Sequence, residues 1–365
     1  MNIYIWSGRS VGNGEFCKQD FGPLLAQDLT PDEIFIQGSS YKMMYDYIQE
    51  RHDISTMRQQ FNEDGFIIFK PEIPEKVLKE AGDFTKLVFD TCTIAENAQT
   101  NTACRSFHLD RYVDIQSVKD LALNFHIRAM LAVLHQHEPY PFQTLNYPLT
   151  SLARTHSDYI HFAAHPLPLM SAAWVALVDV KPEAGPVFYH KGSHKLSFFN
   201  MQDMGLDKRE EDGSLNYAKY QDIMTEAMKK FGNRHEAIIP RGHCLIWSAN
   251  LVHGGPPANI EKTLRLSQVT HYFFHNSNYN WVPIKSDVIN GHIRYYDKEK
   301  NLKKWDNDLD KNMRKSLSKF KNGDCTTFTK NNPHVISPCE MHSRPPQVMS
   351  KLFPHLSEKG NDVLM

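Results

Sequence analysis

The chain of 365 residues is long enough for one large domain with extensions. Its 41 lysines and arginines are balanced by 42 aspartates and glutamates, and the net charge of −1 offers no electrostatic footprint for nucleic acid. The six cysteines are scattered without a CxxC pair, no apolar run is long enough to span a membrane, and no signal peptide is evident, so we expect reduced thiols and a cytoplasmic location.

Residues 1–55 mix apolar and turn residues, and we expect this N-terminal extension to dock on the core. Within it, Ser40–Glu50 has the pattern of a short helix. A strand is predicted over 65–70, a helix begins near Pro74, and a further amphipathic helix is predicted over 116–137. Because their apolar faces need a partner, these helices are expected to buttress one sheet.

Residues 56–275 are predicted to form one domain, mainly β with flanking helices, whose core is a double-stranded β-helix of the jelly-roll, cupin-like type. In its later part, short segments rich in β-branched and aromatic residues alternate with turns, which is typical of that fold. Residues 200–234 form a polar insert, and its part Tyr217–Lys230 is predicted to be helical. The insert is either a lid or a solvated elaboration, with a slight preference for the second.

Residues 276–365 form a lysine-rich C-terminal extension, with a helix predicted over Asp308–Phe320. A charge run of this kind is usually a solvated face. Capping of an active-site mouth and a homodimer contact are the alternatives, and the sequence does not decide among the three.

One short motif and a distant histidine carry the chemistry. His156 and Asp158 are two residues apart in the sequence. Side chains with this spacing in an extended segment point the same way and can coordinate one ion together. His253 follows an apolar strand pattern at the mouth of a glycine turn. Two neutral imidazoles and one carboxylate hold a divalent iron on one face and leave the other open to co-substrate and dioxygen. We therefore predict these three residues as catalytic iron ligands.

An anion anchor is predicted in the strand pattern that follows. Arg265, Ser267 and Val269 alternate onto one face, so a guanidinium and a hydroxyl can both point into a barrel. Arginine can bind the distal carboxylate of 2-oxoglutarate through a bidentate, charge-assisted pair, assisted here by Ser267. The alternative for Arg265 is a salt bridge to a protein carboxylate at the end of the barrel.

These motifs resemble those of the phytanoyl-CoA dioxygenase family of Fe(II)/2-oxoglutarate-dependent oxygenases over roughly residues 55–275. Met57–Phe69 is similar to the family's F-x-x-x-G-[YF] entry strand, and 171–195 resembles its W-x-x-L-x-D, N-G-P-L and P-G-S-H-K blocks. This chain departs from the pattern in two turns, at Ala184-Gly185 and at Lys191-Gly192-Ser193-His194. The resemblance implies iron ligands at His156, Asp158 and His253, a 2-oxoglutarate anchor at Arg265, and a co-substrate-pocket aromatic at Trp174, for which a plain core role is the alternative.

The sequence patterns that indicate candidate substrate residues are less specific than the metal motif. Arg105 and His108 lie in a segment that mixes cationic and aromatic side chains, Arg154 precedes the metal motif by two residues, and His161 follows it. For the first segment a solvated loop is the alternative. The pairs His161/His165 and His190/His194 have a spacing that suits zinc in a helix, but nearby proline and glycine residues argue against helices there.

The function predicted from these residues is that of a dioxygenase that uses Fe(II), 2-oxoglutarate and O2 and hydroxylates an unactivated C–H bond of a small polar or amphipathic metabolite. Succinate and CO2 are the expected co-products. Asp158 disfavours halogenation, because halogenases need that coordination position for chloride. The alternatives are a protein- or peptide-modifying oxygenase and a catalytically silent binding scaffold with the same fold.

Overall fold

A six-stranded antiparallel sheet lies at the centre of the computed structural model, with the strand order β3-β10-β7-β12-β5-β4. Strands from distant parts of the chain are neighbours in it. Their bounds are β3 Phe66–Phe69, β4 His108–Leu109, β5 Pro139–Tyr147, β7 Met170–Ala176, β10 Cys244–Ser248 and β12 Ser267–Phe274. The structure describes residues 39–94, 115–150, 154–165, 169–196, 216–256, 264–275 and 278–285, and shorter pieces at 10–11, 15–16, 108–109, 111–113, 198, 201, 204, 206, 294–297 and 302–305.

Strand β7 shows that both faces of this main sheet are covered. All seven of its residues are buried, whereas a strand with one wet face would alternate between buried and exposed residues. Trp174 packs into an inner core, while Ala173 and Val175 pack into an outer core. The main sheet is therefore a middle layer, with one set of partners on each side.

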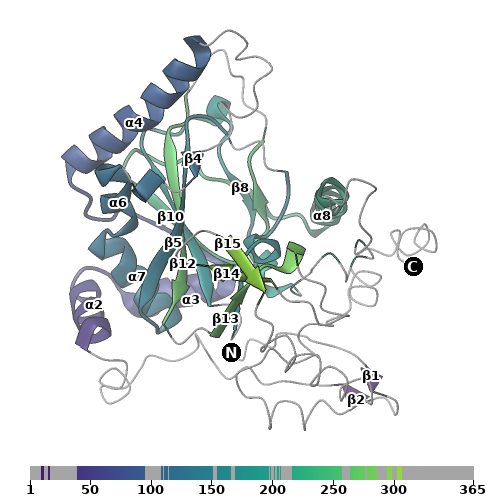
Figure 1. Ribbon diagram of the computed structural model, residues 1–365. Helices are drawn as coiled ribbons and strands as arrows, with labels where there is room; N and C mark the ends of the chain where they lie inside the picture. Colours follow the sequence, from purple (N-terminus) through teal and green to yellow (C-terminus); the bar gives the residue numbers. More distant parts are fainter. Residues whose placement is uncertain are drawn as a thin grey trace.

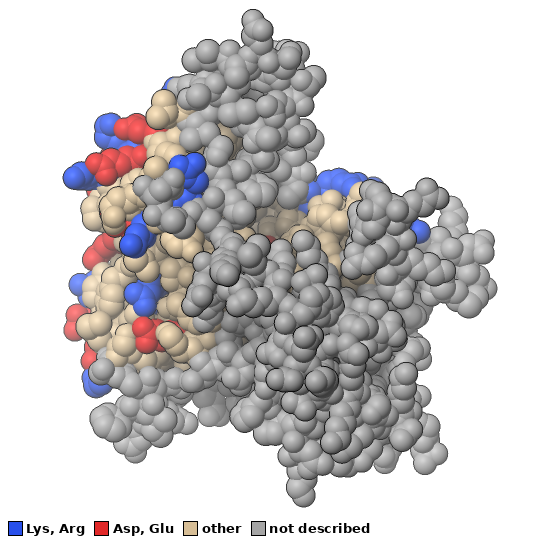
Figure 2. Space-filling view, viewed as in Figure 1, with Lys and Arg blue, Asp and Glu red and all other residues tan. Residues whose placement is uncertain are grey.

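In the described part of the chain, five helices cover the outer face: α2 Ser39–Gln49, α3 Ile54–Asp64, α4 Glu75–Ile94, α6 Gln116–Ala122 and α7 Phe125–His135. Figure 1 shows α2, α4, α6 and α7 along one side of the sheet. Blue and red side chains mix on this side of the molecule (Figure 2). On α4, Lys79 and Asp83 form an ion pair at 2.6 Å. The predicted helices at 40–50 and from Pro74 and the strand at 65–70 are confirmed.

The single helix predicted over 116–137 is wrong, because the structure has two helices there. Asn124, with φ −54° and ψ 124°, begins the second one by accepting a 3.0 Å hydrogen bond from the backbone N–H of Ile127. Asparagine is a preferred N-cap residue, and its extended backbone ends the first helix. Both helices present apolar residues to the sheet, so the apolar pattern alone did not show the break.

Gly65 explains the glycine of the predicted entry motif. It ends α3 in the left-handed region, at φ 85°, and its N–H bonds to the carbonyl of Phe61 immediately before β3 begins. A Cβ at this position would collide with the imidazole of His194. Glycine therefore serves both the helix end and the close packing here.

A smaller sheet faces the inner side of the main sheet. It has the order β11-β8-β9, with β8 Phe188–His190, β9 Arg234–Glu236 and β11 His253–Gly254. The inner core between the two sheets includes Trp174 and Trp247 from the main sheet and Val187 and Tyr189 from the other side. The two sheets form the predicted double-stranded β-helix core with its flanking helices.

Further strands lie beside this core. A four-stranded sheet has the order β15-β14-β13-β6, with β6 Ala163–His165, β13 Asn278–Trp281, β14 Arg294–Asp297 and β15 Leu302–Trp305, and a short pair joins β1 Ser10–Val11 to β2 Glu15–Phe16. The helix predicted over 308–320 lies outside the described residues. None of the helices in the described part of the chain has the length and apolar character needed to cross a bilayer.

Candidate metal and co-substrate site

The predicted metal residues meet at one point of the inner core. His156 and His253 form an isolated β-bridge, with reciprocal N–H to carbonyl bonds of 2.9 and 2.8 Å. Asp158 begins the 3-10 helix Asp158–Ile160 directly after this bridge. Its Oδ1 lies 3.9 Å from Nε2 of His156 and 3.6 Å from Nε2 of His253. One ligand atom from each residue falls within 4.8 Å of the others, a spacing at which three groups can share a metal ion.

The hydrogen bonds of the two imidazoles leave the right nitrogens free for a metal. Nδ1 of His156 lies 2.7 Å from the carbonyl of Arg154, and Nδ1 of His253 lies 2.9 Å from the carbonyl of Leu251. A carbonyl can only accept, so each Nδ1 carries a proton, and in the neutral imidazole Nε2 then has the lone pair. Burial lowers the pKa of His156 to about 3, which keeps its imidazole neutral.

Asp158 is buried and has its own set of neighbours. Trp247 Nε1 donates a 2.7 Å hydrogen bond to Oδ2, and Nε2 of His271 lies 3.6 Å from the same oxygen. Burial by itself would raise the pKa of this carboxyl, but the surrounding imidazoles and their hydrogen bonds hold it well below its usual range. The donor set is thus two imidazole nitrogens and one carboxylate, which fits a divalent iron.

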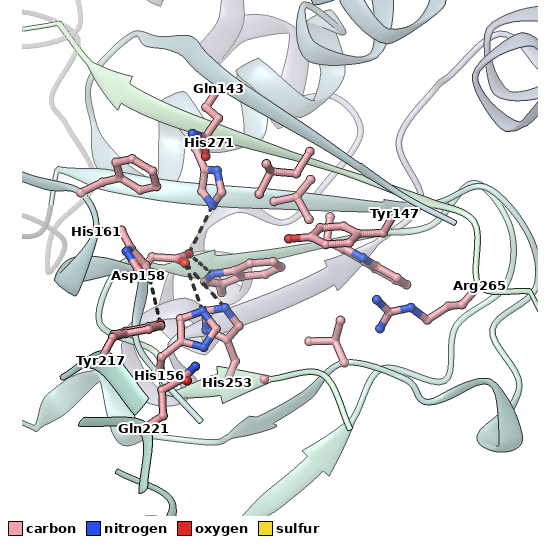
Figure 3. A pocket seen from close by; sticks show the side chains of 17 residues that line it. Gln143, Tyr147, His156, Asp158, His161, Tyr217, Gln221, His253, Arg265 and His271 are labelled. Atoms are coloured by element: carbon pink, nitrogen blue, oxygen red, sulfur yellow. Dashed lines mark hydrogen bonds and ion pairs between the residues drawn. The ribbon is translucent and has the colours of Figure 1, made fainter. Parts of the chain in front are cut away.

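A cavity of about 510 Å³ extends from these ligands along the inner face of the main sheet. Alternation along β5 points Gln143, Leu145 and Tyr147 into it, and alternation along β12 does the same for Val269 and His271. Figure 3 shows Arg265 and Tyr147 on one side of the metal residues, and His161, Tyr217 and Gln221 on another. The cavity therefore has two chemically different ends with the candidate metal site between them.

Arg265 supplies a buried positive charge at one end. Its side chain is 1% exposed and donates to the carbonyls of Gly185 at 3.0 Å and Leu149 at 3.3 Å. Among the described residues it has no carboxylate partner, so the alternative of a barrel-end salt bridge finds no support there. Burial lowers its pKa to about 10, which still leaves the guanidinium protonated at neutral pH. A buried cation without a counter-ion is costly, so this end fits an anionic ligand.

Three buried polar atoms on Arg265 and on two residues of the main-sheet strands have no hydrogen-bond partner among the described residues. They are Nε of Arg265, Oγ of Ser267 and Nε1 of Trp174. Trp174 lines the cavity, and the guanidinium of Arg265 lies 5.6 Å from its ring centroid. Ser267 lies in the predicted phase between Arg265 and Val269 but is not among the lining residues. Trp174 Nε1 and Arg265 Nε are therefore donors at the cavity wall that a carboxylate ligand would satisfy.

The insert lies against the opposite end of the cavity. Its helix α8, Tyr217–Phe231, packs Tyr220, Met224 and Met228 against a cluster that includes Ile160 and Val252. Tyr217 and Gln221 line the cavity, and the Tyr217 hydroxyl lies 2.8 Å from Nε2 of His161. The slight preference for a solvated elaboration is therefore wrong for this helix, which forms a wall of the site. Helix α8 is confirmed at the predicted residues.

The four candidate substrate residues lie in different surroundings. His161 lines the cavity, as proposed. Arg154 does not, because its exposed guanidinium forms an ion pair with Asp222 and donates to the carbonyl of Ala218 at 3.0 Å, both on α8. Arg105 lies outside the described residues. His108 lies in the edge strand β4, opposite Asn146, and only its backbone is described.

The other histidine pairs occupy non-helical or short segments. His190 lies in β8 and donates through Nδ1 to the carbonyl of Gly232 at 2.7 Å. His194 lies in the 3-10 helix Ser193–Lys195, and its Nε2 donates to the carbonyl of Asn62 at 3.1 Å. His165 ends strand β6, whereas His161 caps the 3-10 helix Asp158–Ile160, so these two histidines do not share a helix. The hydrogen bonds of His190 and His194 give those two residues structural roles.

Several cavity residues were missed in the sequence: Gln143, Tyr147, Tyr217, Gln221, Trp247 and His271. His271 is in phase with Arg265 and Val269, so strand alternation was a signal that could have found it. The other five have no motif of their own, because their place in the cavity depends on strand register and on the docking of α8.

Residues 114–262 match the family model described as Phytanoyl-CoA dioxygenase (PhyH). No curated protein matches the chain. Among solved structures, the chain is similar to the non-heme α-ketoglutarate-dependent carbocyclase SnoK from nogalamycin biosynthesis, with 16% identity, a TM-score of 0.46, and coverage of 63% of this chain and 87% of that one. It is also similar to EctD from S. alaskensis with 2-oxoglutarate and 5-hydroxyectoine, with 15% identity, a TM-score of 0.48, and coverage of 72% and 84%.

A third similar structure is HygX from Streptomyces hygroscopicus with nickel and 2-oxoglutarate bound, with 14% identity, a TM-score of 0.41, and coverage of 68% of this chain and 89% of that one. The family match spans the three candidate metal ligands and ends shortly before Arg265. Residues 114–262 of this chain thus match the phytanoyl-CoA dioxygenase (PhyH) family model.

Proposed function

We propose that this enzyme hydroxylates an unactivated C–H bond of a small polar or amphipathic molecule and releases succinate and CO2 from 2-oxoglutarate. The observation that carries the proposal is one cavity lined both by the His156, Asp158, His253 group and by Arg265, whose guanidinium has no carboxylate partner among the described residues. A metal and a dicarboxylate are the ligands these two groups fit.

Each side chain has a definite part in this proposal. His156 and His253 offer Nε2 lone pairs and Asp158 offers a carboxylate oxygen to Fe(II). Arg265 binds the distal carboxylate of 2-oxoglutarate, while apolar side chains such as Val187 and Val269 keep water out of that end. Ferrous iron bound with 2-oxoglutarate supplies the reductive activation of dioxygen that a C–H oxidation needs.

The substrate is assigned to the end of the cavity formed with α8. His161, Tyr217 and Gln221 line this end with hydrogen-bonding groups, and Phe162 adds an aromatic surface. Such a lining suits a polar or amphipathic small molecule. The cavity volume of about 510 Å³ lies in the range of small-molecule sites, which favours this class over a peptide substrate.

The testing experiment is anaerobic addition of Fe(II) and 2-oxoglutarate to metal-free protein. We expect a weak visible charge-transfer band as the keto acid chelates the iron. His156→Ala and Asp158→Ala should lose the band and all iron-dependent turnover, because each removes a ligand, while circular dichroism shows a retained fold. A band of full intensity in either variant would rule out the ligand assignment. No band in folded, metal-loaded wild-type protein would favour the silent scaffold.

The organisation of the chain is also proposed. Residues 1–55 form a docked extension, 56–275 the oxygenase domain with its insert at 200–234, and 276–365 a second extension. Position 55 falls inside α3, so the junction between the first two parts is a continuous helix. A homodimer contact through the C-terminal extension and a cytoplasmic location stay predictions, which gel filtration and localisation of a tagged chain would test.

A further inference from the structure

The two oxygens of the Asp158 carboxylate face different groups. Oδ1 faces the two imidazoles, at 3.9 Å from His156 Nε2 and 3.6 Å from His253 Nε2. Oδ2 accepts the 2.7 Å hydrogen bond from Trp247 Nε1, and His271 Nε2 lies 3.6 Å from it. Figure 3 shows His271 on the side of Asp158 away from His156 and His253. One oxygen is thus directed at the metal position and the other is held from behind.

The strand register of the main sheet determines the positions of Trp247 and His271, the two residues beside Oδ2. Trp247 in β10 lies opposite Ala172 in β7, and Ala172 lies opposite His271 in β12. The three side chains therefore form a row on the inner face, with the smallest of them in the middle strand. Because neighbouring strands are about 4.8 Å apart, the two outer side chains have room between them for the carboxylate of Asp158.

We propose that Trp247 is a positioning residue that makes Asp158 a one-oxygen ligand. A carboxylate without this restraint can rotate and bind a metal through both oxygens, which would occupy a position needed by co-substrate or dioxygen. The indole N–H engages Oδ2 and leaves Oδ1 alone for the metal, with His271 as a second neighbour of Oδ2. This inference rests on the proposed function, because it takes the triad to be a metal site.

A purely structural role is the competing explanation for Trp247. Its side chain is 3% exposed, belongs to the inner core and packs against the ring of His253 with centroids 4.8 Å apart. A structural role depends on the shape of the indole, whereas the proposed role depends on its N–H. The two roles are separated by a change that removes the N–H and keeps the shape.

The experiment replaces Trp247 with benzothienylalanine, in which sulfur takes the place of the indole N–H, by site-specific incorporation. Trp247→Phe is the second variant. Trp174→Phe is the matched control, because Trp174 is also a buried cavity indole but its Nε1 makes no bond to Asp158. Anaerobic titration of the metal-free full chain with Co(II), without 2-oxoglutarate, gives the metal dissociation constant and the visible Co(II) spectrum.

We expect the dissociation constant to rise about 10-fold or more in both Trp247 variants, the usual effect of losing a hydrogen bond to a ligand. The Co(II) bands should shift because the carboxylate is then free to bind through both oxygens, and the metal-free benzothienylalanine protein should melt as the wild type does. Trp174→Phe should keep the wild-type affinity. Wild-type affinity and spectrum in the benzothienylalanine protein would overturn the inference alone, whereas a wild type that binds no Co(II) would overturn the proposed function as well.

Discussion

Arg265 shows how the surroundings of one side chain define a ligand. It is buried, protonated, bonded to two carbonyls and without a carboxylate partner among the described residues. Neutral carbonyls satisfy some of its donors but do not neutralise its charge. The charge balance of this end of the cavity therefore requires an anion from outside the described protein.

The first prediction concerns the fork shape of this side chain. Arg265→Lys keeps a positive charge but loses the planar pair of donors, so the dissociation constant for 2-oxoglutarate should rise about 30-fold, or roughly 2 kcal/mol. Calorimetric titration of Co(II)-loaded protein measures it, and the Co(II) affinity itself should stay unchanged. An unchanged 2-oxoglutarate constant would place the anchor elsewhere.

The second prediction concerns His135 on α7. It is fully buried beside the rings of Phe61 and Phe274, and neither ring nitrogen has a partner among the described residues. Burial lowers its pKa to about 3 from the usual 6.5. Between these values the unfolded chain binds a proton that the folded chain does not, so its contribution to stability is complete above about pH 6.5 and is lost as the pH falls toward 3.

Urea unfolding at pH 7.5 and pH 5 tests this effect in metal-free protein. His135→Leu should reduce the loss of unfolding free energy between the two pH values by about 2 kcal/mol. His126 and His194, whose pKa values burial lowers to about 4, should retain part of the pH dependence. The same pH dependence in wild type and variant would contradict the prediction.

Helix α8 packs the insert against the chain segments that carry the candidate metal ligands. Met224 is 1% exposed and packs in a cluster with Ile160 and Val252, which stand close in sequence to Asp158 and His253. Thr225 on the same helix bonds to Thr155 at 2.9 Å. Loosening this contact should therefore affect both the stability of the insert and the site beside it.

The third prediction is that Met224→Ala lowers the free energy of unfolding by about 2–5 kcal/mol through the cavity it leaves. It should also weaken Co(II) binding, because the ligand segments lose packing support. Denaturant unfolding and metal titration measure the two effects. Glu226→Ala, on the exposed face of the same helix, is the control and should change neither. Loss of stability with unchanged metal affinity would show that α8 does not support the ligands.

For the whole molecule, helix α2 determines whether residues before the main sheet unfold together with the core. Helix α2 places Tyr41, Met44 and Ile48 in the outer core, where it packs against α7. Helix α2 is therefore joined to the core through buried apolar surface. It should unfold together with the sheet.

The fourth prediction compares two residues of α2. Ile48→Ala should lower the global free energy of unfolding by about 2–5 kcal/mol, because Ile48 is 0% exposed. Met43→Ala should change it by less than about 0.5 kcal/mol, because Met43 is 56% exposed. Equal, small effects in urea unfolding would mean that α2 is not part of the cooperative core.

The sequence by itself predicted the sheet-rich core, and its predictions of a metal group and an arginine anchor name residues that the structure brings into one cavity. These features depend on residue types that few other chemistries need, and on short spacings such as His156 to Asp158 that survive in any extended segment. The positions of α2, β3, α4 and α8 followed from local patterns for the same reason. The break at Asn124 did not, because apolar residues on both sides continued the pattern.

Only the tertiary structure decided which side chains surround those ligands. Trp247 and His271 meet the carboxylate of Asp158 because β10, β7 and β12 pair in one register, and a shift of one residue would turn both side chains to the other face. Tyr217 and Gln221 reach the cavity because α8 docks beside His161. Arg154 does not line the cavity and instead forms an ion pair with Asp222 on the same helix. Such contacts join residues far apart in the chain, so no local pattern contains them.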